Sequence, residues 1–436
     1  MLKECFDHLG LLPLTTPAAA ATITTTTNDD ESRPAAAPAP AALPVPLVVD
    51  CTLGYGGHAS YVLKALKNVE RSSSAVLPEL LAFDQDSIEI RKTERRLRQG
   101  LLVATQQQTP ADAAAAAAAS DNNHHNTVTA PPPCSPPTET VRLTVVNQNF
   151  RTVKPYLEHT GQVGMVTALF ADLGLSSMQI DDNTRGFTYK RDGPLDMRMA
   201  TTTTTTSSTT NNQNKNKTNE PTNTKETAYD LLCRLTPKHF EQILKENSDE
   251  LYANEIAFGL LQHTTKNKQK KTSNTNRRIP ETTTELANRV REIVEPIMVL
   301  DTRNDDKNSG TTNKKKNSKK KKGLQHTTKQ VLDRTVARVM QALRIELNQE
   351  FLVLEQLLHD LPDIVAPGGR IVVLTFHSGE DRRVKKSFKA GMKAGIYSSW
   401  SRTVVRPTAL EQHNNPRSSC CKLRWAIRST TNSTTE

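Results

Sequence analysis

Five short runs of apolar residues along the chain predict buried β-strands. They lie at 44–50, 80–83, 141–146, 165–171 and 369–375. Turn-forming or polar residues bound each run, and helical patterns follow the first two, over 58–66 and 87–98. Short apolar runs that alternate with helices are typical of a parallel sheet built from βα units. We therefore predict an α/β fold with a doubly wound sheet.

A helical pattern replaces the strand pattern between residues 226 and 300. Thr236 and Pro237 are typical of an N-cap followed by a first-turn proline. Apolar residues then recur at helical spacing over 240–245, 251–261 and 284–294. An amphipathic pattern over 334–361 predicts one long helix that returns the chain to the sheet.

This change of pattern predicts a small helical domain inserted into the sheet domain. We expect the first part of the sheet domain at 1–199, the helical domain at 200–330 and the second part of the sheet domain at 331–436. Five segments inside these ranges have low complexity and no hydrophobic period. They lie at 15–46, 102–140, 200–225, 262–278 and 302–323. Such compositions cannot bury enough apolar area to offset chain entropy, so we expect disordered inserts.

Composition and charge exclude fewer classes of function than the hydrophobic pattern does. The chain carries 57 Lys and Arg against 46 Asp and Glu, a net charge of +11. The Lys-rich inserts at 262–278 and 302–323 account for this excess, so it is weak support for nucleic-acid binding by the folded part. No apolar stretch is long enough for a membrane span. The six cysteines form no CxxC pair, which argues against a zinc module and for a reducing compartment.

The candidate chemistry lies where the predicted strands end, because ligands of doubly wound sheets bind beyond the carboxyl ends of the strands. After the first strand comes DCTLGYGGH (50–58), whose glycines allow a ligand close to the backbone; a plain glycine turn is the alternative. Asp84 and Asp86 follow the second strand, as acceptors for ribose hydroxyls or as helix N-caps. Phe150 follows the third, as a stacking partner for adenine or a core side chain.

DLGLSSMQ (172–179) follows the fourth strand, at the place where a substrate would meet a cofactor. A glycine loop, ribose acids, an aromatic and a fourth-strand aspartate in this order are the layout of an S-adenosylmethionine-dependent methyltransferase. The resemblance then becomes specific. DCTLGYGGH, DLGLSSMQIDD, RGFTYKRDGPLDMRM, FHSGEDRRVKK and NPRSSCCKLR together resemble the ribosomal RNA small-subunit methyltransferase H family, also called MraW, over residues 1–428 apart from the inserts.

The resemblance implies a Rossmann-like class I methyltransferase sheet, S-adenosylmethionine as cofactor, and methylation of the exocyclic N4 of a cytidine in small-subunit ribosomal RNA. It implies that Gly56, Gly57 and His58 line the amino-acid end of the cofactor. Asp84 would hold the ribose, and Phe150 would contact the adenine. Asp172 and Gln179 would complete the cofactor pocket.

The same resemblance points to residues that would meet the RNA. Arg185, Asp192, Asp196 and Arg198 belong to RGFTYKRDGPLDMRM (185–199), which forms either an RNA-facing wall or a salt-bridged hinge. His377, after the fifth strand, is a candidate contact for the target base. Arg417 and Lys422–Arg424 are candidate phosphate contacts. Ser378 and Asp381 have the S-x-x-D spacing of a capping box, which predicts Ser378 as a helix N-cap.

Methyl transfer to a cytosine amino group requires an acceptor for its N–H but no metal. Asp172 and Ser176 are the hypothesised acceptors. Two other functions stay open, a catalytically inactive RNA-binding factor for ribosome assembly and a methyltransferase on another substrate. The expected partner is small-subunit ribosomal RNA or the assembled small subunit. We expect no association with a membrane. Poly-Thr, poly-Asn and poly-Lys inserts favour a eukaryotic gene, which would place the protein in a mitochondrion or chloroplast; otherwise it would be cytoplasmic.

Overall fold

The computed structural model describes residues 5, 8, 9, 45–68, 76–106, 140–200, 226–261, 278–308 and 317–430. The expected inserts therefore lie mostly outside the described residues. Where their flanks are described, the expectation of no regular structure is wrong, because 102–106, 302–308 and 317–323 are helical. Nucleation is the costly step of helix formation, so polar residues can extend a helix that an amphipathic neighbour has already started.

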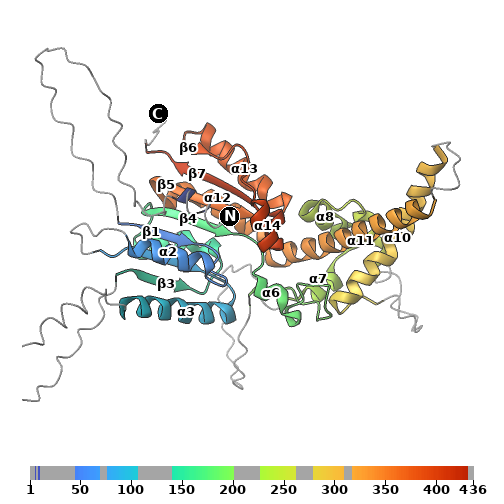
Figure 1. The fold of residues 1–436 in the computed structure, drawn as a ribbon, viewed down its shortest axis with the longest axis horizontal. Coiled ribbons are helices and arrows are strands. Elements are labelled where there is room, and N and C mark those ends of the chain that lie inside the picture. The colour runs from blue at the N-terminus through green and yellow to red at the C-terminus, as the bar shows by residue number, and fades with distance from the viewer. Residues whose placement is uncertain are drawn as a thin grey trace, which may run out of the picture.

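A seven-stranded sheet forms the centre of the first part of the molecule, in the order β3-β2-β1-β4-β5-β7-β6 (Figure 1). The strands are β1 (Leu47–Asp50), β2 (Glu79–Phe83), β3 (Arg142–Val146), β4 (Val166–Asp172), β5 (Val365–Thr375), β6 (Tyr397–Trp400) and β7 (Lys422–Arg428). The first five are parallel and are the five predicted strands, whereas β7 runs antiparallel to β5 and β6. This is the expected Rossmann-like α/β sheet.

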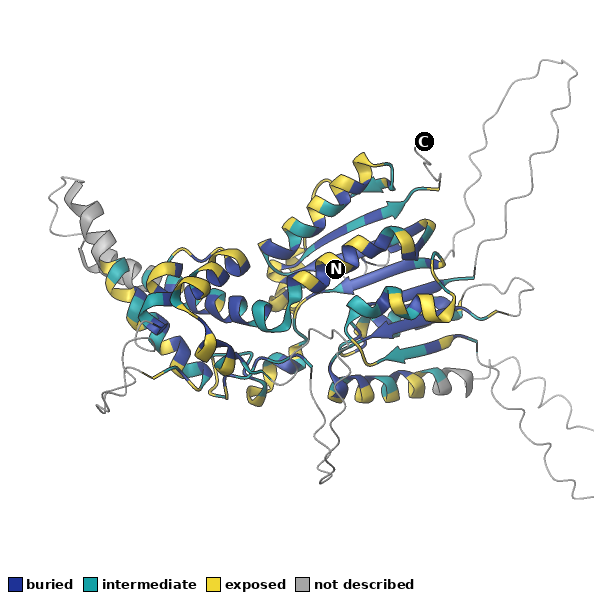
Figure 2. Ribbon diagram, turned by 180° about the vertical axis from the view of Figure 1, so that it is seen from behind, coloured by how far each residue is buried: buried dark blue, intermediate teal, exposed yellow. Residues whose placement is uncertain are grey.

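Helices cover both faces of the sheet, as a doubly wound fold requires. They are α2 (Gly57–Lys67), α3 (Ser87–Gln106), α5 (Val153–Thr160), α12 (Glu350–Ile364) and α13 (Ser378–Lys393). Successive residues of a strand point to opposite faces of the sheet. Val48 therefore packs in the core beneath α2, and Val49 packs in the core beneath α5 and α12. Two buried cores result, one on each face (Figure 2).

A bundle of helices extends from one end of the sheet (Figure 1). It consists of α7 (Ala228–Arg234), α8 (Pro237–Ser248), α9 (Ala253–Leu261), α10 (Thr283–Asn308) and α11 (Asn317–Asn348). Its own core includes Leu244, Ile256, Val290 and Leu343. Thr236 caps α8 by accepting from His239 N, with Pro237 in the first turn, as predicted. No helix in the described part of the chain is long and apolar enough to cross a membrane.

The single long helix predicted over 334–361 is wrong. The chain breaks at Gln349, whose φ of 52° is left-handed, so α11 ends at Asn348 and α12 begins at Glu350. Both segments are amphipathic, and the apolar period continues across the break, so one left-handed residue is invisible to a periodicity analysis. Buried side chains of α11 pack in the helical bundle and those of α12 against the sheet. The division into domains stays a prediction, and this packing moves its proposed boundary from 330 to Gln349.

Candidate functional site

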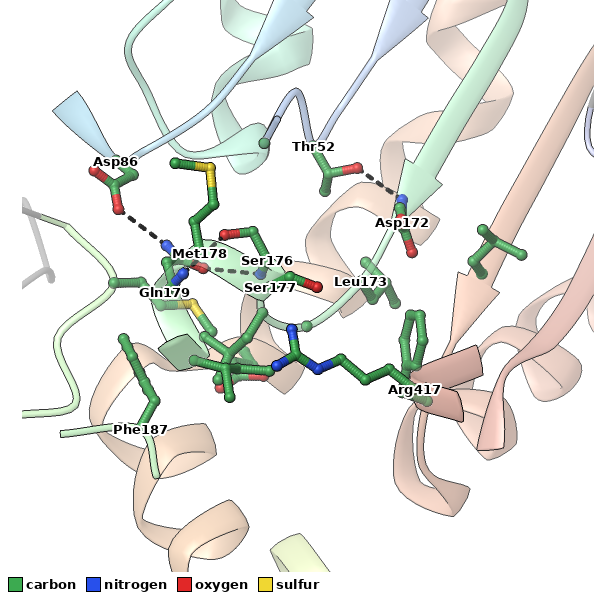
Figure 3. A pocket seen from close by; sticks show the side chains of 18 of the residues that line it. Thr52, Asp86, Asp172, Leu173, Ser176, Ser177, Met178, Gln179, Phe187 and Arg417 are labelled. Atoms are coloured by element: carbon green, nitrogen blue, oxygen red, sulfur yellow. Dashed lines mark hydrogen bonds between the residues drawn. The ribbon is translucent and has the colours of Figure 1, made fainter. Parts of the chain in front are cut away.

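A pocket of about 1090 Å³ opens at the carboxyl ends of β1, β2, β4 and β5 (Figure 3). Eleven of the candidate residues from the sequence line it. They are Gly56, Gly57, His58, Asp84, Asp86, Phe150, Asp172, Ser176, Gln179, His377 and Arg417. Arg185, Asp192, Asp196 and Arg198 are not among the lining residues. The structure therefore brings the predicted cofactor and catalytic residues together. The block at 185–199 lines the same pocket through Phe187, Tyr189, Met197 and Met199, and not through these four charged side chains.

Two adjacent glycines in the loop after β1 have different surroundings. Gly56 has a φ of 73°, and a Cβ there would lie 2.7 Å from Cγ2 of Thr93. Gly57, the first residue of α2, has no protein atom within 4 Å of the position of a Cβ, although it lines the pocket. The fold therefore requires Gly56, whereas the open space at Gly57 is available to a ligand.

Alanine at each position should separate these two roles. We expect Gly56→Ala to lower the free energy of unfolding by more than 1 kcal/mol, because it forces a left-handed alanine against Thr93. We expect Gly57→Ala to leave stability unchanged or slightly higher and to weaken cofactor binding. Urea unfolding and a cofactor titration on both variants measure this. Equal unfolding curves for Gly56→Ala and the wild type would contradict the assignment.

Asp84 and Asp86 follow β2, and only Asp84 keeps free acceptor capacity. Asp84 accepts from Gly54 N at 2.7 Å and from Asp86 N at 2.8 Å, one bond on each oxygen. A carboxylate has about four acceptor positions, so capacity remains for two ribose hydroxyls. Burial raises the pKa of Asp84, an effect that these backbone N–H groups oppose.

Asp86 has become a structural residue. It is 1% exposed, and its Oδ1 caps α3 through Ile88 N and Glu89 N. Its Oδ2 accepts from Arg185 Nη1 at 2.7 Å and Gln179 Nε2 at 3.1 Å. Burial acts to raise the pKa of Asp86, but the hydrogen bond and charge of Arg185 outweigh it and lower the pKa. The helix-cap alternative that the sequence left open therefore holds for Asp86.

Two carboxyl groups end neighbouring strands at the pocket: Asp50 is buried behind the lining, and Asp172 lines the pocket with about a third of its side chain exposed. Asp50 ends β1 and Asp172 ends the neighbouring β4, and burial raises the pKa of each to about 7. Asp50 Oδ2 and Asp172 Oδ1 are buried without a hydrogen-bond partner among the described residues. His58 Nδ1 lies 3.7 Å from Asp172 Oδ2, and burial lowers the pKa of His58 to about 4, so its ring is neutral at pH 7.

The loop after β4 is shaped by a capping box that the sequence analysis missed. Ser176 Oγ accepts from Gln179 N at 3.2 Å, and Gln179 Oε1 accepts from Ser176 N at 3.0 Å. These bonds begin α6 (Ser177–Asp181) and are visible in Figure 3 with the bond from Gln179 to Asp86. The amide of Gln179 is thus committed to the protein, and Gln179 shapes the pocket wall. The signal was present, since S-x-x-Q at 176–179 is a capping-box spacing.

Arg185 acts as a brace between the sheet and the block at 185–199. Besides Asp86, it donates through Nη2 to the carbonyl oxygens of Arg198 and Met199, each at 3.0 Å. Arg198 in turn pairs with Asp196 within the block, at 2.7 Å. These contacts favour the salt-bridged hinge over the RNA-facing wall for Arg185. Roles of Asp196 and Arg198 toward RNA stay predictions.

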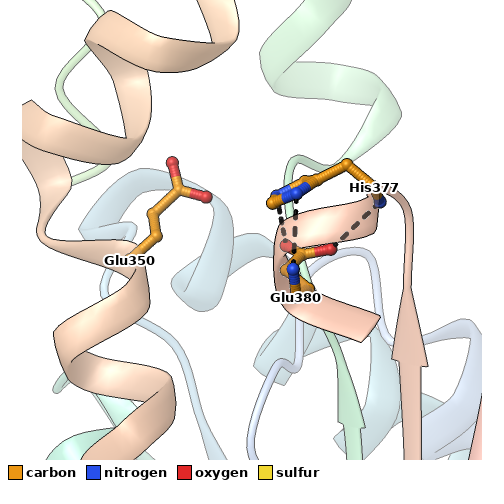
Figure 4. Close-up of side chains that lie close together, drawn as sticks. All are labelled: Glu350, His377 and Glu380. Carbon is orange, nitrogen blue, oxygen red and sulfur yellow. Dashed lines mark hydrogen bonds and ion pairs between the residues drawn. The ribbon is translucent and has the colours of Figure 1, made fainter. Parts of the chain in front are cut away.

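A cluster of charged side chains from the starts of α12 and α13 lines another part of the pocket. Glu350, His377 and Glu380 offer ligand atoms within 4.8 Å of one another (Figure 4). Arg344 Nε and Nη2 bind both oxygens of Glu350, at 2.7 and 2.9 Å, so Glu350 already has a cationic partner. His377 Nε2 lies 3.1 Å from Glu380 Oε1. Burial acts to raise the pKa of Glu380, but His377 outweighs it and lowers the pKa.

The N-cap of α13 is His377 and not Ser378, so the predicted capping box is wrong. His377 Nδ1 accepts from Glu380 N, and Glu380 Oε2 accepts from Phe376 N at 2.8 Å and more weakly from His377 N. A histidine nitrogen accepts as a serine hydroxyl does, and the sequence pattern alone did not show which residue begins the helix. Arg344 and Glu350 were also missed, because they lay inside what the pattern predicted to be one uninterrupted helix.

The C-terminal segment contributes one side of the pocket. Arg417 lines it and pairs with Asp181 of α6 at 2.6 Å, with both side chains about half exposed. Its predicted phosphate contact stays a prediction. Arg424, however, is 4% exposed, lies on β7 and pairs with Asp381, so its prediction as a phosphate contact is wrong. Lys422 pairs with the same carboxylate at 3.4 Å.

These residues fit S-adenosylmethionine on three structural grounds. Asp172 has a buried oxygen without a partner, which suits a cationic amino-acid end. Asp84 has acceptor positions left for a ribose. Gly57 leaves open space beside them. Each ground is a property of a strand end, where doubly wound sheets bind nucleoside ligands.

Comparison with known proteins agrees with this site. A model of the MraW methylase family matches residues 135–219 and 219–429. A protein named ribosomal RNA small subunit methyltransferase H 1 from Lachnoclostridium phytofermentans is 32% identical over 380 residues, 87% of this chain and 75% of its own length. A protein of the same name from Agathobacter rectalis is 33% identical over 379 residues, 87% of this chain and 79% of its own length. The chain belongs to the MraW methylase family and is a methyltransferase that uses S-adenosylmethionine as its methyl donor.

Proposed function

We propose that this methyltransferase methylates the exocyclic N4 amino group of a cytidine in small-subunit ribosomal RNA. The observation that carries the proposal is the match to proteins named as small-subunit ribosomal RNA methyltransferases over 87% of the chain. The pocket agrees with it, because about 1090 Å³ slightly exceeds the usual range for one small ligand and leaves room for a base beside the donor. The charged wall of Glu350, His377 and Glu380 offers polar groups for that base.

The donor, when bound, supplies a methyl group that a sulfonium charge has already activated. The residues of the chain must therefore position the nucleophile, accept its proton and exclude water. A cytosine amino group is a poor nucleophile because its lone pair is delocalised into the ring. Asp172 and Ser176, at the end of β4, are the acceptors that we propose for its N–H. Asp84 and the glycine loop hold the donor in place.

The position of Asp172 inside the pocket, at the end of β4, constrains the RNA. A base that is stacked in a helix cannot reach a recessed acceptor, so it must turn out of its stack or belong to a loop that is already splayed. We propose that His377, which follows the neighbouring strand β5, contacts that base. Asp172 and His377 line the same pocket.

The proton acceptor predicts a pH dependence. Asp172 accepts a proton only when charged, and burial raises its pKa to about 7. We expect kcat/KM to rise about tenfold from pH 6 to pH 8, because the charged fraction rises by that factor. Initial rates across this range measure it. The residual activity of Asp172→Asn should lack this limb, and an unchanged limb in that variant would assign the titration to another group.

The direct test is the identity of the product. Purified protein, labelled S-adenosylmethionine and unmodified small-subunit RNA are incubated, and the digested nucleosides are separated by mass spectrometry. N4-methylcytidine supports the proposal. Donor binding without transfer to RNA or subunits would favour an inactive assembly factor, and label in another nucleoside or molecule would favour a different substrate.

We also propose which form of the RNA is the physiological substrate and where in the cell the protein acts. The assembled small subunit is the proposed physiological substrate, in an organelle that carries bacterial-type ribosomes. The support is that the relatives above are bacterial proteins named for small-subunit RNA, whereas the poly-Asn and poly-Lys inserts favour a eukaryotic gene. Comparing methylation of naked RNA and of isolated subunits tests the partner, and fluorescence microscopy of the tagged protein tests the location.

A further inference from the structure

Helix α13 carries a stripe of basic side chains along its solvent face. The stripe consists of Arg382, Lys385, Lys386, Lys389 and Lys393, all exposed. At about 100° per residue these five positions fall within an arc of about 100°, and the stripe is about 16 Å long. Figure 1 shows α13 on the outside of the sheet beside β6. One face of one helix is thus uniformly cationic.

The acidic side chains of α13 do not neutralise this stripe. Glu380 is buried against His377, and Asp381 pairs with Lys422 and Arg424. The opposite face is apolar, with Val384 and Phe388 buried in the sheet core. Among the described residues, no carboxylate pairs with Lys385, Lys386, Lys389 or Lys393. Alternating charge along this face would provide i,i+4 ion pairs, and these four lysines have none among the described residues.

The stripe begins where the pocket ends. His377, which lines the pocket, caps the N-terminus of α13, and Arg382 lies little more than one turn further along. Arg382 also bonds Asp249 of the helical bundle at 2.8 Å, which fixes this end of α13 at the junction of the two parts of the molecule. A strand that leaves the pocket past His377 therefore meets the lysines next.

We propose that the basic stripe of α13 holds the phosphate backbone of the RNA that flanks the target base. This inference rests on the proposed function, since it deepens the identity of the substrate. Regularly spaced, flexible ammonium groups suit a backbone of repeated single charges, and phosphate contacts position a strand without reading its sequence. Charge complementarity thus assigns one occupant, single-stranded RNA continuous with the base in the pocket.

The test removes the two lysines furthest from the pocket, with a matched control elsewhere. Lys389→Gln/Lys393→Gln removes two charges at i, i+4 spacing, and Arg91→Gln/Arg95→Gln does the same on α3, at the other end of the sheet (Figure 1). Binding to a small-subunit RNA transcript is measured between 50 and 200 mM salt. Each lost phosphate contact lowers the slope of log K against log salt by about 0.7 for single strands. We expect the α13 variant to bind about tenfold more weakly, with the slope reduced by about 1.4.

Kinetics separate this proposal from the proposed function. The α13 variant should show a higher KM for RNA, with kcat at saturating RNA and the affinity for S-adenosylmethionine unchanged, and the α3 variant should behave as wild type. If the α13 variant binds RNA with the affinity and salt dependence of the wild type, the proposed role of the stripe is wrong. If the α13 variant binds naked RNA normally but binds assembled subunits more weakly, the stripe contacts a ribosomal protein, which also contradicts the proposal. The proposed function fails by a different result: the wild-type protein then transfers no methyl group to RNA.

Discussion

Asp84→Asn is expected to weaken S-adenosylmethionine binding by about ten- to a hundredfold. A charge-assisted hydrogen bond contributes about 1.5–3 kcal/mol, and the proposed ribose contact at Asp84 is of this kind. The amide also has one acceptor oxygen in place of two, so Gly54 N and Asp86 N can no longer both be paired. Equilibrium dialysis with labelled cofactor measures the loss, and a melting curve checks that the variant is folded.

Asp363→Asn is the matched control for this change. Asp363 is an exposed aspartate in the last turn of α12, at the amino end of β5 and away from the pocket, and it pairs with Lys154. It should bind the cofactor as the wild type does. A folded Asp84→Asn variant with wild-type affinity would remove the ribose role from Asp84 and with it the main support for placing the cofactor at the end of β2.

Arg185→Met is expected to destabilise the protein by about 3–5 kcal/mol. It removes the cation paired with Asp86, which is 1% exposed, and a buried charge without a partner costs about that much. It also leaves the carbonyl oxygens of Arg198 and Met199 without their donor. Urea unfolding at pH 7 measures the loss of free energy.

A second substitution distinguishes the brace from an RNA contact. In Arg185→Met/Asp86→Asn the unpartnered charge is gone, so the double variant should recover part of the lost stability. If Arg185 instead faced RNA, the single variant would keep the stability of the wild type and lose affinity for RNA. That result would reverse the assignment made from the contacts of Arg185.

The parallel strands and the residues at their ends could be predicted because both signals are local. An apolar run such as 80–83 specifies a buried strand, and topology then places whatever follows it at the ligand-binding edge. Asp84, Asp172 and Gly57 were found in this way. The antiparallel strands β6 and β7 were missed, because YSSW is short and KLRWAIR places charges within its apolar pattern.

What the sequence left undecided was set by tertiary partners. Asp84 and Asp86 are the same residue type two positions apart. Asp86 caps α3 through its Oδ1, and the approach of Arg185 and Gln179 occupies its Oδ2 as well. The break at Gln349 likewise depends on α11 and α12 packing in different cores. Glu350 was missed for that reason, since its place on the pocket wall follows from the turn between the two helices.

Calorimetric titration of the folded protein with S-adenosylmethionine tests the central claim most directly. The claim is that the ends of β1, β2 and β4 form one donor site. We predict uptake of one equivalent, with affinity that falls in Asp84→Asn and in Gly57→Ala and is unchanged in Asp363→Asn. Absence of binding heat at several temperatures, on protein that melts cooperatively, would contradict the claim.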